Sequence, residues 1–569
     1  MKSISEKRIT IISFCILTVS SIFIGRLFIL QVISVDKYRD RAEEQYSKTS
    51  GTLYDRGSIF FKRKDGELIS AAGLKTGYLL VINPSKITNA EALYEKLQKI
   101  TPLDKEGFLK SAAKKDDTYE EVAKKVEEEA GKKIKALGLK EVSLYVERWR
   151  YYPGNTLASS VLGFVGHTED GFSGQYGIER FYNETLERNQ DGLYGNFFVE
   201  VFSGIESFIS SKKIEREADL VLTIEPVAQA YVENVLTDFD KEGKPTEAGI
   251  IVLDPQTGNI IAMASVPTFN PNTYSKEKNQ KAFRNPLVSG AYEMGSIIKT
   301  LTMSAGIDAG VISETDTYND EGFLKIDDYT IYNFDKKGRG VIPMQTVLDK
   351  SLNTGAVYMM RQLGQEKFKD YFTKFGLADK TLVDLPDEGS GNISNLDSGR
   401  DINFATASFG QGIAVTPINI ARALSSLANG GYLIRPHVVS EINYKGLPSK
   451  EIHTEESGKV ISEDASRRIT AMLVHVVDKA LLGGKVALPH YSVAAKTGTA
   501  QISNPKGGYY TDRFLHSFFG YFPAYDPQFL IFLYAVNPQN AEYASQSLTT
   551  PFMDITRFLL NYYEIPPDR

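Results

Sequence analysis

The first hydrophobic feature of the chain is a long apolar run over residues 9–33, whose one charged residue is Arg26. A bilayer-spanning helix needs about 20 predominantly apolar residues, and an arginine near the end of such a helix can reach the interface. Lysine and arginine precede the run, and positive flanks stay in the cytoplasm. The pattern therefore predicts a transmembrane helix over 9–33, a cytoplasmic tail over 1–8 and an extracytoplasmic remainder.

The same run has a second interpretation, a secretory signal peptide that is removed from the mature protein. A signal peptide ends in a cleavage site with small residues at fixed positions, and no such site follows residue 33. We therefore favour an uncleaved anchor. No later stretch is apolar over a length that could span a membrane.

Residues 34–216 have a mixed pattern. Residues 78–82 read as a short strand that ends at an Asn-Pro pair. Residues 91–138 are rich in Lys, Glu and Ala, with apolar residues at helical spacing. Within them, the charged block Lys124–Glu129 is interpreted as the solvated face of a helix. A mixed α/β domain is expected over this part of the chain.

From residue 217 the pattern changes to strands, then helices, then strands again. A hairpin is expected around the turn Asp254–Gly258, and Thr416 with Pro417 opens a helix that ends before Gly430. The expected strands are 220–224, 249–253, 259–264, 491–501, 514–523 and 529–536, and the expected helices include 226–236, 296–309, 417–429 and 552–562. This order favours an α+β domain over 217–569, in which helices pack on one antiparallel sheet.

Composition narrows the class of protein. The chain of 569 residues is 42% hydrophobic and 24% charged, an ordinary globular balance, and it is long enough for several domains. Its net charge of −6 argues against a nucleic-acid-binding protein. Cys15 is the one cysteine, so the rest of the chain can form neither a disulfide nor a thiolate metal site. The histidines show no metal-ligand spacing, and we expect no metal and no cofactor.

Ser296 and Lys299 are the first candidate catalytic pair. Residues three apart on a helix share a face, and Gly295 permits a tight turn into that helix. A serine hydroxyl is a weak nucleophile until a base takes its proton. A lysine can be that base when burial, a nearby cation such as Lys496, and the helix N-terminus lower its pKa. Ser296 is not in a Gly-x-Ser-x-Gly elbow, which disfavours a Ser-His-Asp triad without excluding it.

Ser-x-x-Lys alone is a weak motif, because it recurs along the chain. The other copies lie at the membrane edge, in the charged helical region, in polar loops or linkers, or around a proline that breaks a helix. Their serines are Ser34, Ser111, Ser210, Ser275 and Ser503.

Two further motifs supply groups that serve such a serine. Ser351 and Asn353 lie between two amphipathic stretches, where a hydroxyl can pass a proton and an amide can hold a substrate amide; a simple loop or helix cap is the alternative. In Lys496–Thr499 the lysine and hydroxyls can bind a carboxylate. Gly498 lets a substrate approach the backbone, and the strand offers amides for an oxyanion hole. A second Lys-Thr-Gly, Lys75–Gly77, is interpreted as a turn before a strand.

Taken as a set, these motifs resemble those of the class B (monofunctional) penicillin-binding proteins. The resemblance extends over almost the whole chain. The other segments that carry it are Arg56-Gly57-Ser58-Ile59, Arg150-Tyr151-Tyr152-Pro153, Gly177-Ile178-Glu179, Tyr292-Glu293-Met294-Gly295, Phe409-Gly410-Gln411-Gly412 with Thr416-Pro417, and His516-Ser517-Phe518-Phe519-Gly520. Many members have proline where Met294 stands, and Lys62–Gly66 replaces a common Asp-Arg-Asn-Gly.

The resemblance implies an elongated pedestal, or dimerisation-type, domain over 34–216 and a β-lactamase/transpeptidase-like domain over 217–569. It implies a peptidoglycan D,D-transpeptidase, a serine acyltransferase that cross-links stem peptides ending in D-Ala-D-Ala and that β-lactams inhibit covalently. The expected location is the cell membrane. The expected protein partners are a glycan polymerase and the division complex, and no nucleic acid is expected.

The resemblance also assigns roles to the candidate residues. Ser296 would attack the D-Ala-D-Ala bond with Lys299 as the base. Ser351 and Lys496 would relay a proton to the leaving amine.

The remaining candidates would bind the donor peptide. Asn353 would hold the donor amide, and Thr497 and Thr499 would bind the terminal carboxylate beside Gly498. The backbone amides of Ser296 and Thr499 would form the oxyanion hole.

Three alternatives to this predicted function remain open. Gly163–Glu179 and the stretch after Lys496 look more like the division-specific branch than the elongation branch, so septal synthesis is expected and an elongation-type enzyme is the first alternative. A scaffold or β-lactam sensor without catalysis is the second, and the intact motifs disfavour it. A D,D-carboxypeptidase or β-lactamase that uses water as acceptor is the third, and the long pedestal disfavours it.

Overall fold

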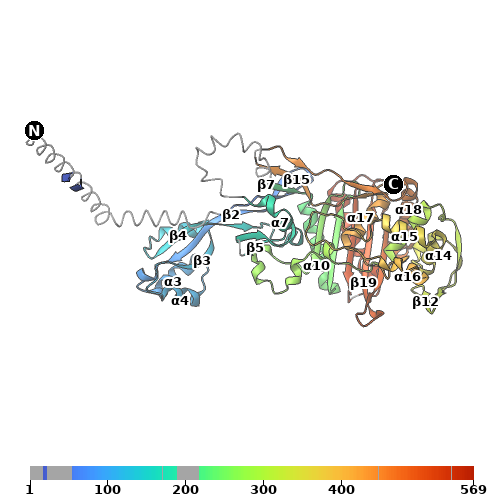
Figure 1. The fold of residues 1–569 in the computed structure, drawn as a ribbon, viewed down its shortest axis with the longest axis horizontal. Helices are drawn as coiled ribbons and strands as arrows, with labels where there is room; N and C mark the ends of the chain where they lie inside the picture. Colours follow the sequence, from blue (N-terminus) through green and yellow to red (C-terminus); the bar gives the residue numbers. More distant parts are fainter. Residues whose placement is uncertain are drawn as a thin grey trace, which may run out of the picture. The chain divides into compact units, whose positions relative to one another are not determined.

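The structure is a computed structural model, and its described residues form two compact units. The described residues are 17–18, 20–21, 54–168, 171–188, 217–445, 447–539 and 541–569. The small unit is Leu74–Trp149; the large unit comprises Arg56–Gly73, Arg150–Arg188 and the described part of Gly195–Arg569 (Figure 1). The predicted membrane span 9–33 lies, apart from four residues, outside the described residues. None of the helices that are described is long and apolar enough to cross a bilayer.

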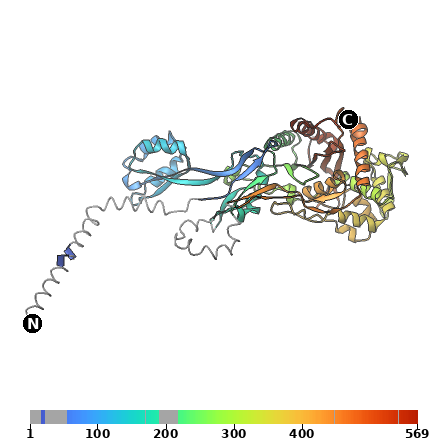
Figure 2. The same ribbon diagram turned by 90° about the horizontal axis from the view of Figure 1, so that it is seen from above.

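The small unit packs helices on strands. Its elements are part of β2 (Leu68–Ile82), α3 (Ala90–Gln98), α4 (Lys105–Ala112), β3 (Glu120–Glu127), α5 (Glu128–Ala136) and most of β4 (Val142–Tyr151). Strand β2 pairs with both β3 and β4. Buried side chains from the strands and helices form one cluster, which includes Leu80, Leu97, Phe108, Val126 and Ile134. In Figure 2 this unit is drawn in blue and cyan, with its helices lying over its strands.

Two interpretations of this region are wrong. Lys124–Glu129 is not one helix face, because Glu120–Glu127 is strand β3 and helix α5 begins only at Glu128. Val126 pairs with Tyr78 of β2 and is 2% exposed, so cross-strand packing outweighs the helix-favouring composition. Lys75–Gly77 is not a turn either, since it lies inside strand β2.

The large unit is built on one five-stranded antiparallel sheet, as predicted. The strand order is β18 (Ala494–Ser503), β19 (Tyr509–Phe522), β20 (Phe529–Val536), β8 (Glu247–Leu253) and β9 (Ile260–Val266). Every neighbouring pair in this sheet is antiparallel. The predicted closing strand 529–536 coincides with β20, because an uninterrupted apolar run between turn residues marks a fully buried strand.

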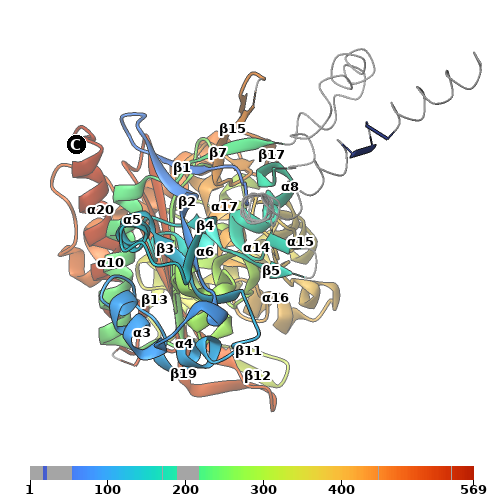
Figure 3. The ribbon, with the colours of Figure 1, turned by 90° about the vertical axis from the view of Figure 1, so that its left-hand side faces the viewer.

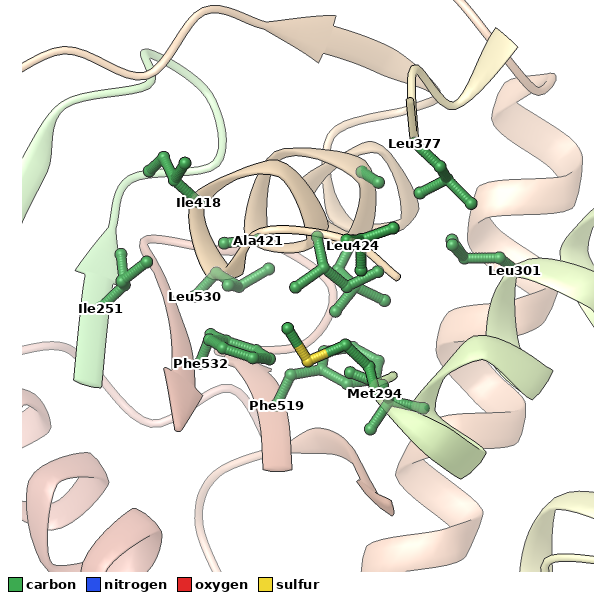
Figure 4. Packing of buried hydrophobic residues seen from close by; sticks show 14 of the residues in the cluster. Ile251, Met294, Leu301, Leu377, Ile418, Ala421, Leu424, Phe519, Leu530 and Phe532 are labelled. Carbon is green, nitrogen blue, oxygen red and sulfur yellow. The ribbon is translucent and has the colours of Figure 1, made fainter. Parts of the chain in front are cut away.

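Helices cover both faces of this sheet. Because successive strand residues point to opposite faces, Ile251 and Phe532 pack with α12 (Ile298–Asp308) and α17 (Pro417–Ala428) in one cluster. Ile250 and Leu533 pack with α10 (Pro226–Gly243) and α20 (Thr549–Tyr562) in the other. Figure 3 shows α10 and α20 on one side of the strands and α17 on the other. Figure 4 shows Ile418 and Leu424 of α17 above Phe532.

Three segments quoted for the pedestal meet in a buried ion cluster of the large unit. Arg56 Nε lies 2.7 Å from Glu179 Oε2, and Arg150 Nε lies 2.5 Å from Glu179 Oε1. The Tyr152 hydroxyl donates to the same carboxylate at 3.1 Å. Burial alone would raise the pKa of Glu179, but the two guanidinium groups outweigh it and hold that pKa below its ordinary value. Segments far apart in the sequence are thus tied together at one point.

The large unit contains further helices and strands. They include the turn η7 (Gly295–Ile297), the hairpin strands β10 (Thr317–Asp320), β11 (Phe323–Ile326), β12 (Tyr329–Tyr332) and β13 (Gly340–Pro343), and the helices α13 (Met344–Asp349), α14 (Asn353–Leu363), α15 (Gln365–Lys374), α16 (Asp401–Ala407), α18 (Glu463–His475) and α19 (Ala544–Ser547). The prediction of a single antiparallel sheet is wrong for strand 220–224. This strand is β7 (Ala218–Leu222), which belongs to a second sheet, where it pairs in parallel with β1 (Ile59–Lys62) and antiparallel with β15 (Val439–Tyr444).

Candidate active site

Ser296 lies in the 3-10 turn η7, which leads directly into helix α12. Ser517 Oγ on β19 holds this turn by donating to Met294 O at 2.7 Å. Gly295 has a φ of +64°, a conformation that favours glycine. A Cβ at Gly295 would lie 2.8 Å from Thr499 O. The glycine therefore brings the nucleophile candidate against strand β18.

Lys299 lies one turn further along and is fully buried. Its Nζ donates to Ser351 O at 2.7 Å and lies 3.3 Å from Ser351 Oγ. Burial, together with the positive charge of Lys496, lowers the pKa of Lys299 well below its ordinary value. The shift favours the neutral amine, which is the form that can take a proton.

Ser351 connects the two lysines. It lies in the short segment between α13 and α14 and has a φ of +53°, which is uncommon for a residue with a side chain. Its Oγ is 3.3 Å from Lys299 Nζ and 3.1 Å from Lys496 Nζ. A hydroxyl can donate one hydrogen bond and accept others, so this oxygen can carry a proton between the two amines.

Lys496 is the second buried amine of the site, with 3% of its surface exposed. Its Nζ donates to Thr497 O at 2.9 Å and to Ser351 Oγ at 3.1 Å. Burial lowers the pKa of Lys496 to about 8, against a smaller raising effect of Asp349. The group therefore changes charge in the range in which a proton relay works.

Asn353 begins helix α14, and its amide Nδ2 donates to Tyr332 O at 2.8 Å. The next residue, Thr354, belongs to a buried polar cluster. Thr354 Oγ1 donates to Asp320 Oδ1 at 2.9 Å, and Asn333 Nδ2 donates to the same oxygen at 2.8 Å. The hairpin strands β10–β13 are thus attached to the end of α14 that carries Asn353. No periodic pattern or motif in the sequence predicts this attachment.

Thr497, Gly498 and Thr499 lie on β18 beside the nucleophile turn. A Cβ at Gly498 would collide with Ser517 Oγ and would lie 2.7 Å from Met294 O. The structure therefore gives Gly498 a purpose that the sequence did not suggest, the close packing of β18 on η7. The predicted approach of a substrate to this glycine stays a prediction. Thr499 Oγ1 accepts a hydrogen bond from Ala544 N–H at 3.0 Å.

Glu293, two residues before Gly295, forms a hydrogen-bonded pair with Tyr509 of β19. The Tyr509 hydroxyl is 3.0 and 3.2 Å from the two carboxylate oxygens of Glu293. Burial raises the pKa of Glu293, against the lowering effect of a Gly412 backbone hydrogen bond and of Tyr509. The sequence placed Glu293 in a motif but assigned it no contact.

Among the candidate residues, Lys299, Ser351 and Lys496 form one chain of contacts. Gly295, which precedes Ser296, lies against Thr499, and Asn353 is bonded to Tyr332 O. The arrangement supplies a hydroxyl nucleophile, two amines of lowered pKa and a bridging hydroxyl, which together suit acyl transfer through a serine ester.

Two family models match the chain. The Penicillin binding protein transpeptidase domain matches residues 248–556, and the Penicillin-binding Protein dimerisation domain matches residues 54–194. The first covers more than half of the chain, so the chain belongs to the penicillin-binding protein transpeptidase family. The combination of the two domains is that of a class B penicillin-binding protein, as the motifs predicted.

Known proteins resemble the chain over most of its length. Stage V sporulation protein D of Bacillus subtilis (strain 168) is 28% identical, covering 93% of this chain and 81% of its own. Peptidoglycan D,D-transpeptidase FtsI of Escherichia coli (strain K12) is 26% identical, covering 99% and 92%. The crystal structure of Penicillin Binding Protein 2X from Streptococcus thermophilus aligns with a TM-score of 0.72 at 21% identity, covering 90% and 81%. The structural likeness shows the shared fold.

Proposed function

We propose that this protein is a peptidoglycan D,D-transpeptidase that works through an acyl-enzyme on Ser296. One observation carries the proposal: Ser351 Oγ lies within hydrogen-bond distance of two buried lysines, Lys496 and Lys299. Lys299 is one helical turn after Ser296. Buried amines of lowered pKa are costly for stability and are typical of functional sites. The family and the name of the Escherichia coli relative support a peptidoglycan D,D-transpeptidase. The resemblance of the motifs implies the substrate class, stem peptides that end in D-Ala-D-Ala.

In the acylation step, Ser296 Oγ attacks the carbonyl carbon of the penultimate D-alanine. Its proton passes to neutral Lys299, and the backbone amides of Ser296 and Thr499 stabilise the oxyanion. The C–N bond then breaks, and the leaving amine takes a proton relayed through Ser351 from Lys496. Free D-alanine departs and leaves an ester on Ser296.

In the second step, the amine of an acceptor stem attacks this ester. A new amide forms, the ester bond breaks, and the acceptor's proton returns through the lysines to Ser296. Asn353 would hold the donor amide, and Thr497 and Thr499 would hold its terminal carboxylate through hydroxyl donors. β-Lactams acylate the same serine because they offer a reactive amide in the place of the donor.

Labelling with a fluorescent penicillin tests the nucleophile. The full-length protein in detergent is labelled, separated on a denaturing gel and mapped by peptide mass spectrometry. We expect a stable adduct on Ser296 that Ser296→Ala abolishes. Ser275→Ala, which removes another Ser-x-x-Lys serine, is the matched control and should label normally.

Each other outcome contradicts one part of this proposal. A folded sample that takes no label supports the scaffold or sensor function. A label that Ser296→Ala retains refutes the assigned nucleophile. Rapid loss of the label supports a β-lactamase or carboxypeptidase, in which water is the acceptor.

We further propose septal cell-wall synthesis, because FtsI of Escherichia coli is among the relatives and the quoted segments resemble the division branch. The proposed organisation is a tail over 1–8, a membrane helix over 9–33, a pedestal over 34–216 and the catalytic domain over 217–569 outside the cytoplasm. A glycan polymerase and the division complex would be its partners. Depletion should give filamentous cells, and rounded cells would instead indicate the elongation-type enzyme.

A further inference from the structure

His516 is a fully buried histidine on the strand next to β18, and the proposed mechanism does not use it. It lies on β19 as the direct cross-strand partner of Thr499 on β18. Its two ring nitrogens contact the segment 542–547, which contains helix α19. Nε2 is 3.2 Å from Glu542 O, and Nδ1 is 2.7 Å from Ser547 Oγ.

The two contacts require one particular tautomer. A carbonyl oxygen only accepts hydrogen bonds, so Nε2 carries the proton that points to Glu542 O. Nδ1 is then the acceptor, and the Ser547 hydroxyl donates to it. Burial lowers the pKa of His516 to about 4, so the imidazole stays neutral and this pattern persists near neutral pH.

The same segment also binds Thr499. Ala544 N–H donates to Thr499 Oγ1 at 3.0 Å. Once this oxygen accepts from the backbone, the hydroxyl proton is left to point elsewhere, and a carboxylate is an acceptor that can receive it. Thr499 and His516, which face each other across two strands, therefore both attach to segment 542–547.

Segment 542–547 also contacts the residues that follow strand β12. The rings of Tyr543 and Phe334 are 5.9 Å apart in an edge-to-face contact. Phe334 lies two residues after Tyr332, and the carbonyl of Tyr332 accepts a hydrogen bond from the Asn353 side-chain amide. The segment is thus in contact with both the Thr499 side and the Asn353 side of the site.

We propose that His516 is a positioning residue for donor binding: it holds segment 542–547 so that Ala544 fixes the Thr499 hydroxyl as a hydrogen-bond donor to the terminal carboxylate of the donor peptide. The inference rests on the proposed transpeptidase function and adds to it the residue that orients the carboxylate site. His516 itself does not touch the substrate; it acts through the segment.

Two probes that differ only in the carboxylate test this. One is a thioester analogue of an acyl-D-Ala-D-Ala dipeptide with a free carboxylate, and the other is its methyl ester. For full-length His516→Leu in detergent, acylation (kcat/KM) by the free acid should fall about tenfold, the range of one lost charge-assisted hydrogen bond. Acylation by the ester should stay unchanged. His516→Gln keeps a donor for Glu542 O and should recover part of the loss.

Matched variants distinguish a loss of the Thr499 hydroxyl orientation from a general loss of protein stability. His437→Leu removes another buried histidine, whose Nδ1 lies 3.3 Å from Arg435 O, and should lower the melting temperature without changing the acid-to-ester ratio. Thr499→Val should lose the acid preference, and His516→Leu added to it should cost nothing more. If His516→Leu does not fold, Ser547→Ala decides, with a smaller loss in the same direction.

Two outcomes overturn the inference. An equal loss on acid and ester shows that His516 has a structural role only, and an unchanged ratio in all the variants removes the link to Thr499. Both presuppose that the wild type is acylated on Ser296. If neither probe acylates the wild type, the proposed function itself fails, so the two failures are distinguishable.

Discussion

Lys75-Thr76-Gly77 in the small unit and Lys496-Thr497-Gly498 in the large unit have the same sequence and the same secondary structure. Each tripeptide lies in a strand, β2 or β18. Lys75 has a side chain that is 34% exposed and forms an ion pair with Glu127 at 2.8 Å. Lys496 is buried and bonded to Ser351 Oγ. The chemical role of the tripeptide therefore depends on the residues that surround it and not on its own sequence.

The glycines of the two tripeptides are more alike than the lysines. A Cβ at Gly77 would lie 2.7 Å from the Trp149 ring, and a Cβ at Gly498 would lie 2.7 Å from Met294 O. In both places a strand approaches a neighbour closely. At Gly77 the neighbours are the Val126 carbonyl and Trp149 of the small unit, whereas at Gly498 they include the turn that carries the nucleophile. The same steric requirement thus supports packing in one case and the active site in the other.

The largest difference between the two copies is expected when each lysine is made apolar. Lys496→Met should slow acylation by a fluorescent penicillin about 10³-fold, within the range of lost proton-transfer catalysis. Lys75→Met should leave the rate unchanged. A comparable loss in Lys75→Met would mean that the small unit contributes to acylation.

Alanine substitutions at the two glycines should affect different properties, the acylation rate in one case and the stability in the other. Gly498→Ala should lower the acylation rate about 10²-fold, because a shift of about 1 Å at the nucleophile turn is enough for such a loss. Gly77→Ala should instead destabilise the small unit by about 1–3 kcal/mol through overpacking, with acylation unchanged. Acylation rates and urea unfolding of the two variants, measured side by side, check this contrast.

The pH dependence should identify Lys496 as the relay acid. Burial lowers its pKa to about 8, so its protonated fraction, and with it the acylation rate, should fall about tenfold per pH unit above that value. Lys496→Arg stays charged, and its slower rate should show no such fall. Lys75→Arg should retain the wild-type profile. A fall that persists in Lys496→Arg would assign it to another group.

The smallest expected effect is on stability. Between pH about 8 and the value of about 10.4 for an unfolded lysine, the unfolded chain binds more protons at Lys496, so the free energy of unfolding rises with pH there. Lys496→Met should show a smaller rise than the wild type, because only the contribution of Lys299 is left. It should also be more stable at pH 7 by about 1–2 kcal/mol, because a buried charge is removed. Lys75→Met should lose at most about 1 kcal/mol, the value of an exposed ion pair. Urea unfolding at pH 7 and 10 tests both.

Several elements were predictable because their signals are local. Thr416 caps α17 by accepting from Asn419 N–H at 3.2 Å, and Pro417 stands in the first turn. The apolar run of β20 and the turn of the β8–β9 hairpin were also predictable from the sequence. Strand β3 was not, because its Lys- and Glu-rich composition favours a helix and only its pairing with β2 makes it a strand.

The sequence alone determined which groups are present and in what order: a serine at a helix start, a lysine one turn later, a Ser-x-Asn segment and a Lys-Thr-Gly strand. It also determined which segments form the five-stranded sheet and the helices that pack on it, because side-chain periodicity and capping act over a few neighbouring residues. The helix ends were less certain: α10 runs on to Gly243, beyond the predicted end at residue 236, and α20 begins at Thr549, before the predicted start at residue 552. Only the tertiary structure decided that Lys496 meets Ser351, 145 positions away, and that His516 holds the segment against Thr499. Those contacts depend on burial and long-range pairing, which no local pattern encodes and which alone lower the pKa of a lysine to a useful value.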